Sequence, residues 1–388
     1  MAIPEKVLAT SPGAQCVEEP LDVVIVGAGA AGVGCAVVLK QLGITHFKLL
    51  ERFSVGASFT RWPKEMRFIT PSFMSNGFGL LDLNAVALNT SPAYFLKNEH
   101  PSGPEYARYL QALVSTLALP VHTGVDVHAI QPDPDGHGFS IETSSGCFRS
   151  RFVIWAAGEF QYPRLEGITG VQLCLHISQV RSWRHLPGKD MLIIGGYESG
   201  IDAATHLVAL GKRVRVIEKS WIWQSEKSDP SLTLSPNTQE RFREALRSGL
   251  LGLIANTHVT RIIRTHSGYA VETECGEWFT TPTPPILATG FTGSLQLISG
   301  WLEWNESKQV VLTEEDESTC VPGLFVVGPY VRHGDATFCF IYKFRQRFAL
   351  VANTIAKRLG LDTSLMNYYR ENNMLLEKLS CCTDFCIC

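Results

Sequence analysis

The sequence predicts an α/β protein with two domains of the same strand–loop–helix–strand design, one inserted into the other. Three observations support this prediction. A glycine-rich loop follows an apolar run at residue 27, and the same arrangement recurs at residue 195. The chain has 388 residues, 45% of them hydrophobic, which is enough for two or three domains with cores of their own.

Composition excludes several classes of function. The formal net charge is −3, and both signs are scattered without a basic stripe, so nucleic acid is not an expected partner. No apolar run reaches the length of about 18 residues that a membrane span needs. Residues 1–20 are polar and mixed and lack the pattern of a secretory signal, so we expect a short disordered lead and a cytoplasmic protein.

The first glycine loop has the context that dinucleotide binding requires. The apolar run 21–26 precedes it, a helical stretch follows to about residue 42, and a second apolar run ends at Glu51. Gly27 permits a sharp turn, Gly29 lets the backbone approach a pyrophosphate, and Gly32 lets helix and strand pack closely. The helix start offers free N–H groups to phosphates. The residues expected to contact the dinucleotide here are Gly27, Gly29, Ala30, Ala31, Gly32 and Glu51.

The second loop repeats this order with a damaged glycine pattern. Tyr197 stands at the position of the middle glycine, where a side chain crowds a pyrophosphate. Glu218 ends the following apolar run and disfavours a 2′-phosphate, so NADH is expected rather than NADPH if a nicotinamide binds. An empty domain and a domain that holds another dinucleotide remain alternatives. The candidate contact residues are Gly195, Gly196, Ser199, Gly200 and Glu218.

With both loops in view, the chain resembles the flavoproteins that have two nested dinucleotide-binding domains. These include pyridine nucleotide–disulfide oxidoreductases, thioredoxin-reductase-like enzymes and flavin-containing monooxygenases. Residues 152–162 (FVIWAAGEFQY) and 285–291 look like the strands that join the two domains in that superfamily, and residues 321–328 (VPGLFVVG) look like its last FAD-binding strand. The resemblance covers about residues 21–360. It implies FAD in the first domain, NADH or NADPH in the second, and a homodimer by analogy.

The resemblance also implies a domain layout. The fold class is α/β, with two nested Rossmann-like dinucleotide-binding domains, the FAD domain being discontinuous. We expect the FAD-binding domain at 21–165 and 284–360, the second dinucleotide-binding domain at 166–283, and a C-terminal helix with a Cys-rich tail at 361–388. A helix at about 337–359 would aim its start at the flavin, and residues 364–379 are expected to form the C-terminal helix.

Further cofactor contacts follow from the resemblance. Residues 56–62 (GASFTRW) are similar to the segment after the acidic residue in monooxygenase-like and bacillithiol-disulfide-reductase-like members. An Asp that binds the ribityl chain in the superfamily is replaced here by Pro329, so that contact must come from elsewhere. The segment 62–84 either covers the flavin or is an ordinary packed loop. The residues assigned to the cofactor on these grounds are Arg52, Ser58, Trp62, Ala157, Gly158 and Gly328.

Four of the 11 cysteines lie in the last eight residues: Cys381, Cys382, Cys386 and Cys388. Only the vicinal pair resembles the C-terminal pair of mercuric reductases. Three interpretations compete: a redox shuttle between flavin and an outside thiol or disulfide, a site for a soft metal ion, and a tail whose thiols are incidental. Eight extended residues span about 25 Å, enough for a shuttle to swing.

The leading hypothesis is an FAD-dependent thiol/disulfide oxidoreductase in which the tail cysteines are catalytic and the substrate is a small-molecule or protein disulfide or thiol. No CxxC or CxxxxC pair lies near either loop, which leaves the tail as the candidate relay. The alternatives are an FAD-dependent monooxygenase of a small nucleophilic substrate and a soft-metal-binding flavoprotein.

Overall fold

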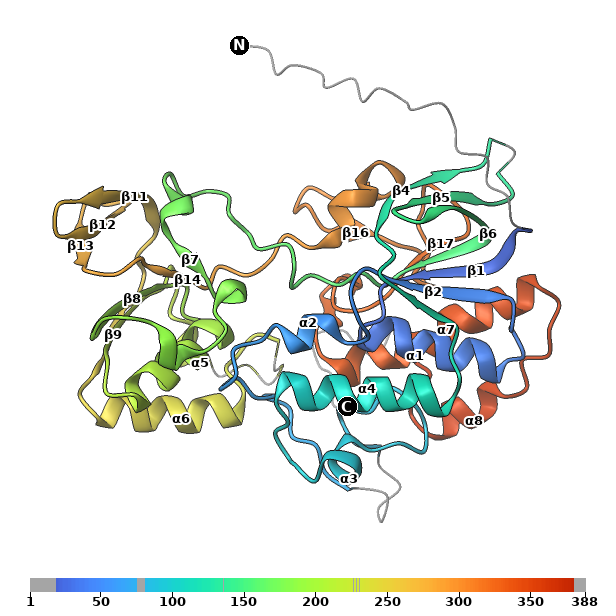
Figure 1. The fold of residues 1–388 in the computed structure, drawn as a ribbon, viewed down its shortest axis with the longest axis horizontal. Helices are drawn as coiled ribbons and strands as arrows, with labels where there is room; N and C mark the ends of the chain where they lie inside the picture. The colour runs from blue at the N-terminus through green and yellow to red at the C-terminus, as the bar shows by residue number, and fades with distance from the viewer. Residues whose placement is uncertain are drawn as a thin grey trace, which may run out of the picture.

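The computed structural model describes residues 19–74, 81–134, 136–225, 227, 229 and 231–379. The chain forms two bodies joined by two connecting segments (Figure 1). The expected disordered lead lies almost wholly outside the described residues. The four tail cysteines lie outside them as well, and their role stays a prediction.

The first body is built on a mixed sheet in the strand order β3-β2-β1-β6-β5-β4, with β17 also paired to β6. β6 is long, and its two halves have different partners: residues 146–150 pair with antiparallel β5, while residues 153–155 lie between parallel β1 and β17. Its strands are β1 (Leu21–Val26), β2 (Phe47–Glu51), β3 (Val121–Thr123), β4 (Val127–Pro132), β5 (Phe139–Thr143), β6 (Gly146–Trp155) and β17 (Leu324–Val326).

Helix α1 (Ala30–Gln41) lies under strands β1 and β2 and packs beside α7 (Ile341–Arg358) (Figure 1). Residues 30–39 of α1 are all buried, which is why its sequence is apolar on every face. A Cβ on Gly34 would lie 2.1 Å from the ring of Phe348, so glycine is what lets the two helices approach. The remaining helices of this body are α2 (Ala57–Thr60), α3 (Pro92–Leu96), α4 (Gly103–Thr116) and α8 (Met366–Glu371).

The second body contains a parallel five-stranded sheet in the order β10-β9-β8-β14-β7 and a three-stranded antiparallel sheet, β11-β12-β13. Helices α5 (Glu198–Ala209) and α6 (Pro236–Arg247) cover the parallel sheet, and a separate cluster of apolar residues forms the core between them. The strands are β7 (Leu175–His176), β8 (Asp190–Ile194), β9 (Arg213–Ile217), β10 (Leu251–Ile254), β11 (Val259–Thr265), β12 (Gly268–Thr273), β13 (Trp278–Thr281) and β14 (Ile286–Leu287).

The two connecting segments, 156–164 and 288–294, run beside each other. The Arg164 amide donates to the carbonyl oxygen of Gly290 at 3.0 Å, and Pro163 and Phe291 form an antiparallel bridge. Trp155 Nε1 donates to Ser294 Oγ at 3.0 Å. The two segments with small residues in the sequence are therefore the junctions between the bodies.

Two expected helices differ from the structure. The helix expected at 337–359 begins four residues later, because Ala336–Thr337 forms β19, which pairs with β18 (Arg332–His333) around Gly334 at φ +56°. The helix expected at 364–379 is wrong beyond residue 371. Asn373 takes a left-handed φ of +54°, which ends the helix, and the Leu376 amide then bonds the Gln346 carbonyl on α7.

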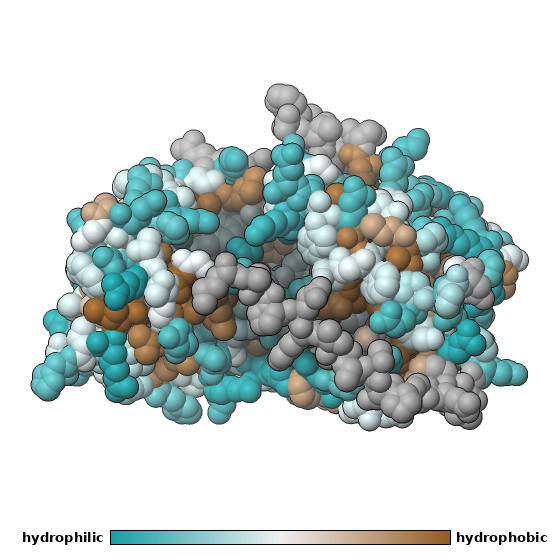
Figure 2. All heavy atoms as spheres, turned by 90° about the horizontal axis from the view of Figure 1, so that it is seen from above, coloured by the Kyte–Doolittle hydropathy of each residue, from teal (hydrophilic) through white to brown (hydrophobic). Residues whose placement is uncertain are grey.

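Short elements complete the described chain. A hairpin pairs β15 (Glu303–Trp304) with β16 (Val310–Val311), and 3₁₀ turns cover 171–173, 177–179, 183–185, 222–224 and 294–301. β14 belongs to the second sheet, which therefore extends past residue 283, the expected end of the second domain, to residue 287. Among the described residues, no helix combines the length and apolarity that crossing a membrane requires. On the face seen in Figure 2, hydrophilic side chains are interspersed with smaller groups of hydrophobic ones.

Candidate dinucleotide and active site

The first glycine loop has the geometry that its sequence predicts. Gly27 takes a φ of +102°, and a Cβ there would lie 2.6 Å from the Ala156 carbonyl oxygen on the first connecting segment. A Cβ on Gly32 would lie 1.9 Å from the Gly27 carbonyl oxygen. No atom lies within 4 Å of a Cβ built on Gly29, the N-cap of α1, so the backbone there faces open space. Unbonded N–H groups of the first turn of α1 are available to an anion at this point.

Glu51 holds the loop in place. Its Oε2 accepts from the Ala28 amide at 2.9 Å, and its Oε1 accepts from the Phe53 amide at 2.8 Å. The residue is 9% exposed. Each carboxylate oxygen has a second lone pair, so the group can also accept from a ribose hydroxyl.

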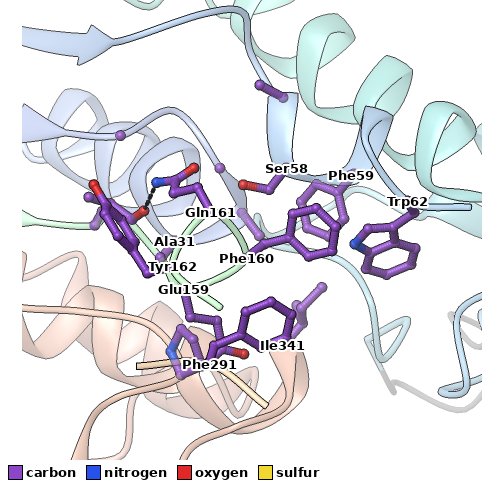
Figure 3. Close-up of a pocket in the computed structure, with 18 of the residues that line it drawn as sticks. Ala31, Ser58, Phe59, Trp62, Glu159, Phe160, Gln161, Tyr162, Phe291 and Ile341 are labelled. Carbon is purple, nitrogen blue, oxygen red and sulfur yellow. Dashed lines mark hydrogen bonds between the residues drawn. The ribbon is translucent and has the colours of Figure 1, made fainter. Parts of the chain in front are cut away.

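A cavity of about 480 Å³ opens above this loop (Figure 3). Its wall combines the first loop, the end of β2, the first connecting segment, the start of α7 and the start of α5. The sequence-predicted residues that line it are Gly27, Gly29, Ala30, Ala31, Glu51, Arg52, Ser58, Trp62, Ala157, Gly158 and Ser199.

The rings of Phe59, Trp62 and Phe68 form one wall, and the buried Tyr106 ring packs behind them. The ring centroids of Phe68 and Tyr106 are 4.5 Å apart, those of Phe59 and Tyr106 are 4.8 Å apart, and those of Trp62 and Phe68 are 5.0 Å apart. Residues 66–70 and Asn84 also line the cavity. Of the two interpretations of segment 62–84, the structure therefore favours a covering role over an unrelated packed loop.

The second loop repeats the geometry of the first. A Cβ on Gly195 would lie 2.4 Å from the Ala288 carbonyl oxygen on the second connecting segment, and one on Gly200 would lie 1.9 Å from the Gly195 carbonyl oxygen. Glu218 Oε2 accepts from the Gly196 amide at 2.6 Å, as Glu51 does from Ala28. Tyr197 has φ −88° and ψ −163°, against −81° and −166° for Gly29. The repeat thus extends to backbone angles, and Tyr197 is tolerated because its φ is negative.

Other residues of the second body cover the second glycine loop. Trp223 Nε1 donates to the Gly196 carbonyl oxygen at 2.7 Å, and a Cβ on Gly196 would lie 2.6 Å from the Trp223 ring. The Tyr197 hydroxyl donates to the Thr233 carbonyl oxygen at 2.9 Å. Glu198 accepts from Thr238 Oγ1 at 2.7 Å and from the Ser235 amide, and burial raises its pKa. A dinucleotide would share this space with Trp223 and Thr233.

The predicted contacts of the second loop do not all face the cavity. Ser199 lines it, together with Glu198 and Asp202, whereas Gly195, Gly196, Gly200 and Glu218 are absent from its wall. Gly32 and Gly328 also lie behind the wall; a Cβ on Gly328 would lie 3.4 Å from that of Ala31. Their assignment to a cofactor stays a prediction.

Sequence reasoning missed three residues of the wall or its support. Glu159 follows the Ala157–Gly158 pair on the first connecting segment and lines the cavity (Figure 3). Tyr330 follows Pro329 and acts electrostatically on Glu159. Cys339 precedes α7, lines the cavity, and donates from Sγ to Ser231 Oγ at 3.1 Å. The sequence held a signal for Glu159, because this acid directly follows the Ala157–Gly158 pair that was assigned to the cofactor.

The residues fit FAD. The first loop leaves open space at the helix start where a diphosphate would lie, Glu51 can accept from the ribose, and an apolar aromatic wall is available to a flavin ring. The cavity also reaches α5 of the second body, so a second ligand there would approach the first.

The sequence of this chain is similar to those of known oxidoreductases. A family model described as Pyridine nucleotide-disulphide oxidoreductase matches residues 24–328. The chain is 25% identical over 338 residues to bacilliredoxin reductase Bdr of Bacillus subtilis, covering 86% of this chain and 97% of the relative. It is 24% identical over 374 residues to a ferredoxin–NADP reductase of Rhodopseudomonas palustris, covering 92% and 96%.

Solved structures give the same fold. The bacillithiol disulfide reductase Bdr of Staphylococcus aureus superposes with a TM-score of 0.71 at 20% identity, covering 88% of this chain and 99% of that one. A flavin-containing monooxygenase from Stenotrophomonas maltophilia superposes with a TM-score of 0.70 at 17% identity, covering 88% and 100%. These structures share the two-body design and do not separate reductase from monooxygenase chemistry.

Proposed function

The chain belongs to the pyridine nucleotide-disulphide oxidoreductase family, and we propose that it is an FAD-dependent thiol/disulfide oxidoreductase supplied with electrons by NADH. Members of this family bind FAD and use NAD(P)H. The observation that carries the proposal is the cavity above the first loop, which also receives Ser199 and Asp202 of the second body. A bacilliredoxin reductase matched along 97% of its length supports a disulfide as substrate.

FAD would be held by the first loop and Glu51, with Arg52, Ser58 and Trp62 at the side of the cavity. Bound there, the flavin supplies reversible transfer of an electron pair between a nicotinamide and a sulfur centre. The aromatic wall would pack against the reacting groups and exclude water from them. The start of α7, where Phe340 is the N-cap, lines the cavity and directs a positive helix end into it.

The test of this function is anaerobic. Purified protein reconstituted with FAD is mixed with NADH and hydroxyethyl disulfide, and released thiols are counted against NADH consumed. One NADH should yield two thiols. Bleaching of the flavin by NADH without thiol release would contradict the proposal.

The finer proposal is that Cys381, Cys382, Cys386 and Cys388 relay electrons from the cavity to an outside disulfide. Replacing all four by Ser should slow reduction of a protein disulfide at least about tenfold while leaving flavin reduction by NADH unchanged, since attack on a disulfide needs a thiolate. The matched control replaces Cys275 and Cys320, which are exposed and outside the cavity wall. Equal rates in the wild type and the four-serine variant would contradict the relay.

The second loop sets the affinity for the reductant. Replacing Tyr197 by Gly restores the middle glycine, and we expect NADH to bind about tenfold more tightly, which corresponds to about 1.4 kcal/mol. Tyr197→Phe keeps the ring and removes the hydroxyl that donates to the Thr233 carbonyl oxygen, so it should bind NADH as the wild type does. Isothermal titration with NADH and NADPH checks this. Tighter binding of NADPH than of NADH would show that Glu218 does not select against the 2′-phosphate.

A second candidate function is an FAD-dependent monooxygenase of a small nucleophile. It is favoured by the similarity of fold to the Stenotrophomonas enzyme and by the apolar wall of Phe59, Trp62 and Phe68. Oxygen consumption that rises in proportion to an amine or thioether substrate, with that substrate recovered carrying one added oxygen atom, would favour it over disulfide reduction.

A further inference from the structure

Glu159 occupies a fixed place at the meeting point of the two connecting segments. The Tyr162 amide donates to its carbonyl oxygen at 2.8 Å, and the Ser294 amide donates to the Gly158 carbonyl oxygen at 3.1 Å. These bonds hold the backbone from both sides. The side chain lines the cavity beside Phe160 and Phe291 (Figure 3). An ionisable group is thus placed among apolar rings, where a charge is poorly solvated.

Tyr330 is a neighbour of this carboxyl, and among the described residues its buried hydroxyl has no hydrogen-bond partner. Tyr330 follows β17 in the chain, and its ring lies over Gly293 of the second connecting segment. A Cβ on Gly293 would lie 1.8 Å from the Tyr330 hydroxyl oxygen, and Gly293 takes a φ of +80°, so glycine is required there for two reasons. Burial and the neighbouring Glu159 raise the pKa of Tyr330 well above its usual range, which keeps the phenol protonated.

Two arginines complete the surroundings of Glu159. Arg332 Nη1 donates to the carbonyl oxygens of Pro329 and Val331, each at 2.7 Å, and Arg164 Nη2 donates to the Phe291 carbonyl oxygen at 3.3 Å. Burial raises the pKa of Glu159, and the Tyr330 hydroxyl, Arg332 and Arg164 lower it in part. The raised pKa is the net result, so the carboxyl keeps its proton to a higher pH than an exposed glutamate does.

We propose that Glu159, which lines the cavity among apolar rings, is its proton donor and acceptor. This inference rests on the proposed thiol/disulfide activity, because it names the group that completes that reaction.

The proton balance of disulfide reduction requires such a group. Two electrons and one proton from the reduced cofactor convert a disulfide to one thiol and one thiolate, as the S–S bond breaks and the departing sulfur keeps the bonding pair. The Glu159 O–H bond then breaks, its proton forms the S–H bond, and a carboxylate remains that solvent reprotonates. In thiol oxidation the carboxylate accepts the proton instead. General acid catalysis of this kind contributes about 10² or more to a rate.

The experiment compares two disulfides that differ in their need for a proton. The reduced, FAD-loaded enzyme is mixed in single turnover with hydroxyethyl disulfide, whose alkyl thiolate leaves poorly, and with 5,5′-dithiobis(2-nitrobenzoate), whose aromatic thiolate leaves readily without protonation. Glu159→Gln should slow the alkyl disulfide about 100-fold and the aromatic one less than about twofold. Glu166→Gln, at an exposed neighbouring carboxyl, is the matched control. Equal losses on both disulfides, or no loss on either, would overturn the inference.

The pH dependence of the rate with the alkyl disulfide gives a second, independent test. In the wild type the alkyl rate should fall as pH rises through the raised pKa of Glu159, and in Glu159→Gln this fall should be absent. The neighbouring Tyr330 hydroxyl lowers the pKa of Glu159. Tyr330→Phe should therefore move the falling limb to higher pH, and a shift to lower pH would contradict this effect of Tyr330 on Glu159.

A stability measurement separates failure of the inference from failure of the proposed function. A carboxyl with a raised pKa destabilises the fold as pH rises above its value in the unfolded chain. Glu159→Gln should therefore melt at a higher temperature than the wild type at pH 8, with the difference shrinking towards pH 5. A wild type that reduces neither disulfide would overturn the proposed function. A variant with no pH-dependent stability difference would overturn the role of Glu159 as a proton reservoir.

Discussion

Gly32→Ala yields a colourless protein that is less stable by about 3 kcal/mol, the upper part of the range for overpacking. The added Cβ would lie 1.9 Å from the Gly27 carbonyl oxygen, and that atom belongs to backbone that Glu51 and the first connecting segment hold in place. The helix must therefore move away from the loop. The diphosphate site at its start is lost with the movement, and FAD retention and thermal melting measure the result.

Two matched glycines separate damage to the fold from damage to the site. Gly29→Ala places a Cβ where no protein atom lies within 4 Å, so the apoprotein should melt as the wild type does while FAD affinity drops at least about tenfold, or about 1.4 kcal/mol. Gly300→Ala, exposed and without neighbours, should change neither. A yellow, normally stable Gly32→Ala protein would refute the role of the loop.

Arg347→Met should cost about 3–5 kcal/mol of unfolding free energy, the usual loss when one partner of a buried ion pair is removed. Arg347 Nε and Nη2 donate to the two Asp316 carboxylate oxygens at 2.8 Å each, and both side chains are fully buried. Arg347 Nη1 also donates to the Leu376 carbonyl oxygen at 2.8 Å, and His333 Nε2 lies 2.6 Å from Asp316 Oδ1. The variant leaves the Asp316 carboxylate in the core without its main partner.

Denaturant unfolding of three proteins checks this interpretation. Arg358→Gln breaks a pair with Glu317 in which the arginine is 40% exposed, and it should cost about 1 kcal/mol or less. Combining Arg347→Met with Asp316→Leu removes both buried charges and should recover most of the loss. If Arg347→Met costs no more than Arg358→Gln, the buried pair does not hold α7 in place.

Local pattern was sufficient to predict the loops, because each needs only its own strand, glycines, helix and acid. Gly27 and Gly32 meet atoms a few residues away or on the adjoining junction, and glycine at these positions is visible in the sequence. The backbone angles of Tyr197 match those of Gly29, so the repeat inferred from the sequence is also present in the backbone conformation. Helix ends were less predictable, because a hairpin at 332–337 and a left-handed Asn373 depend on tertiary contacts.

The missed residues share a physical cause. Glu159 and Tyr330 are 171 positions apart, and Gly293 lies between them in the sequence, so only the crossing of the connecting segments brings them together. Trp223 covers Gly196 from 27 residues away through an irregular segment without periodicity. Long-range contacts between non-repetitive segments leave no periodic signal in the sequence. Glu159 itself can be read in the sequence directly after Gly158.

The hydrogen bond between Arg164 and Gly290 means that the entry and exit of the inserted body are neighbours in space. A short peptide could therefore bridge residues 163 and 291 without stretching, and each part would keep its own core. Such a deletion would give a minimal flavin module, and the excised part could be exchanged for that of a relative.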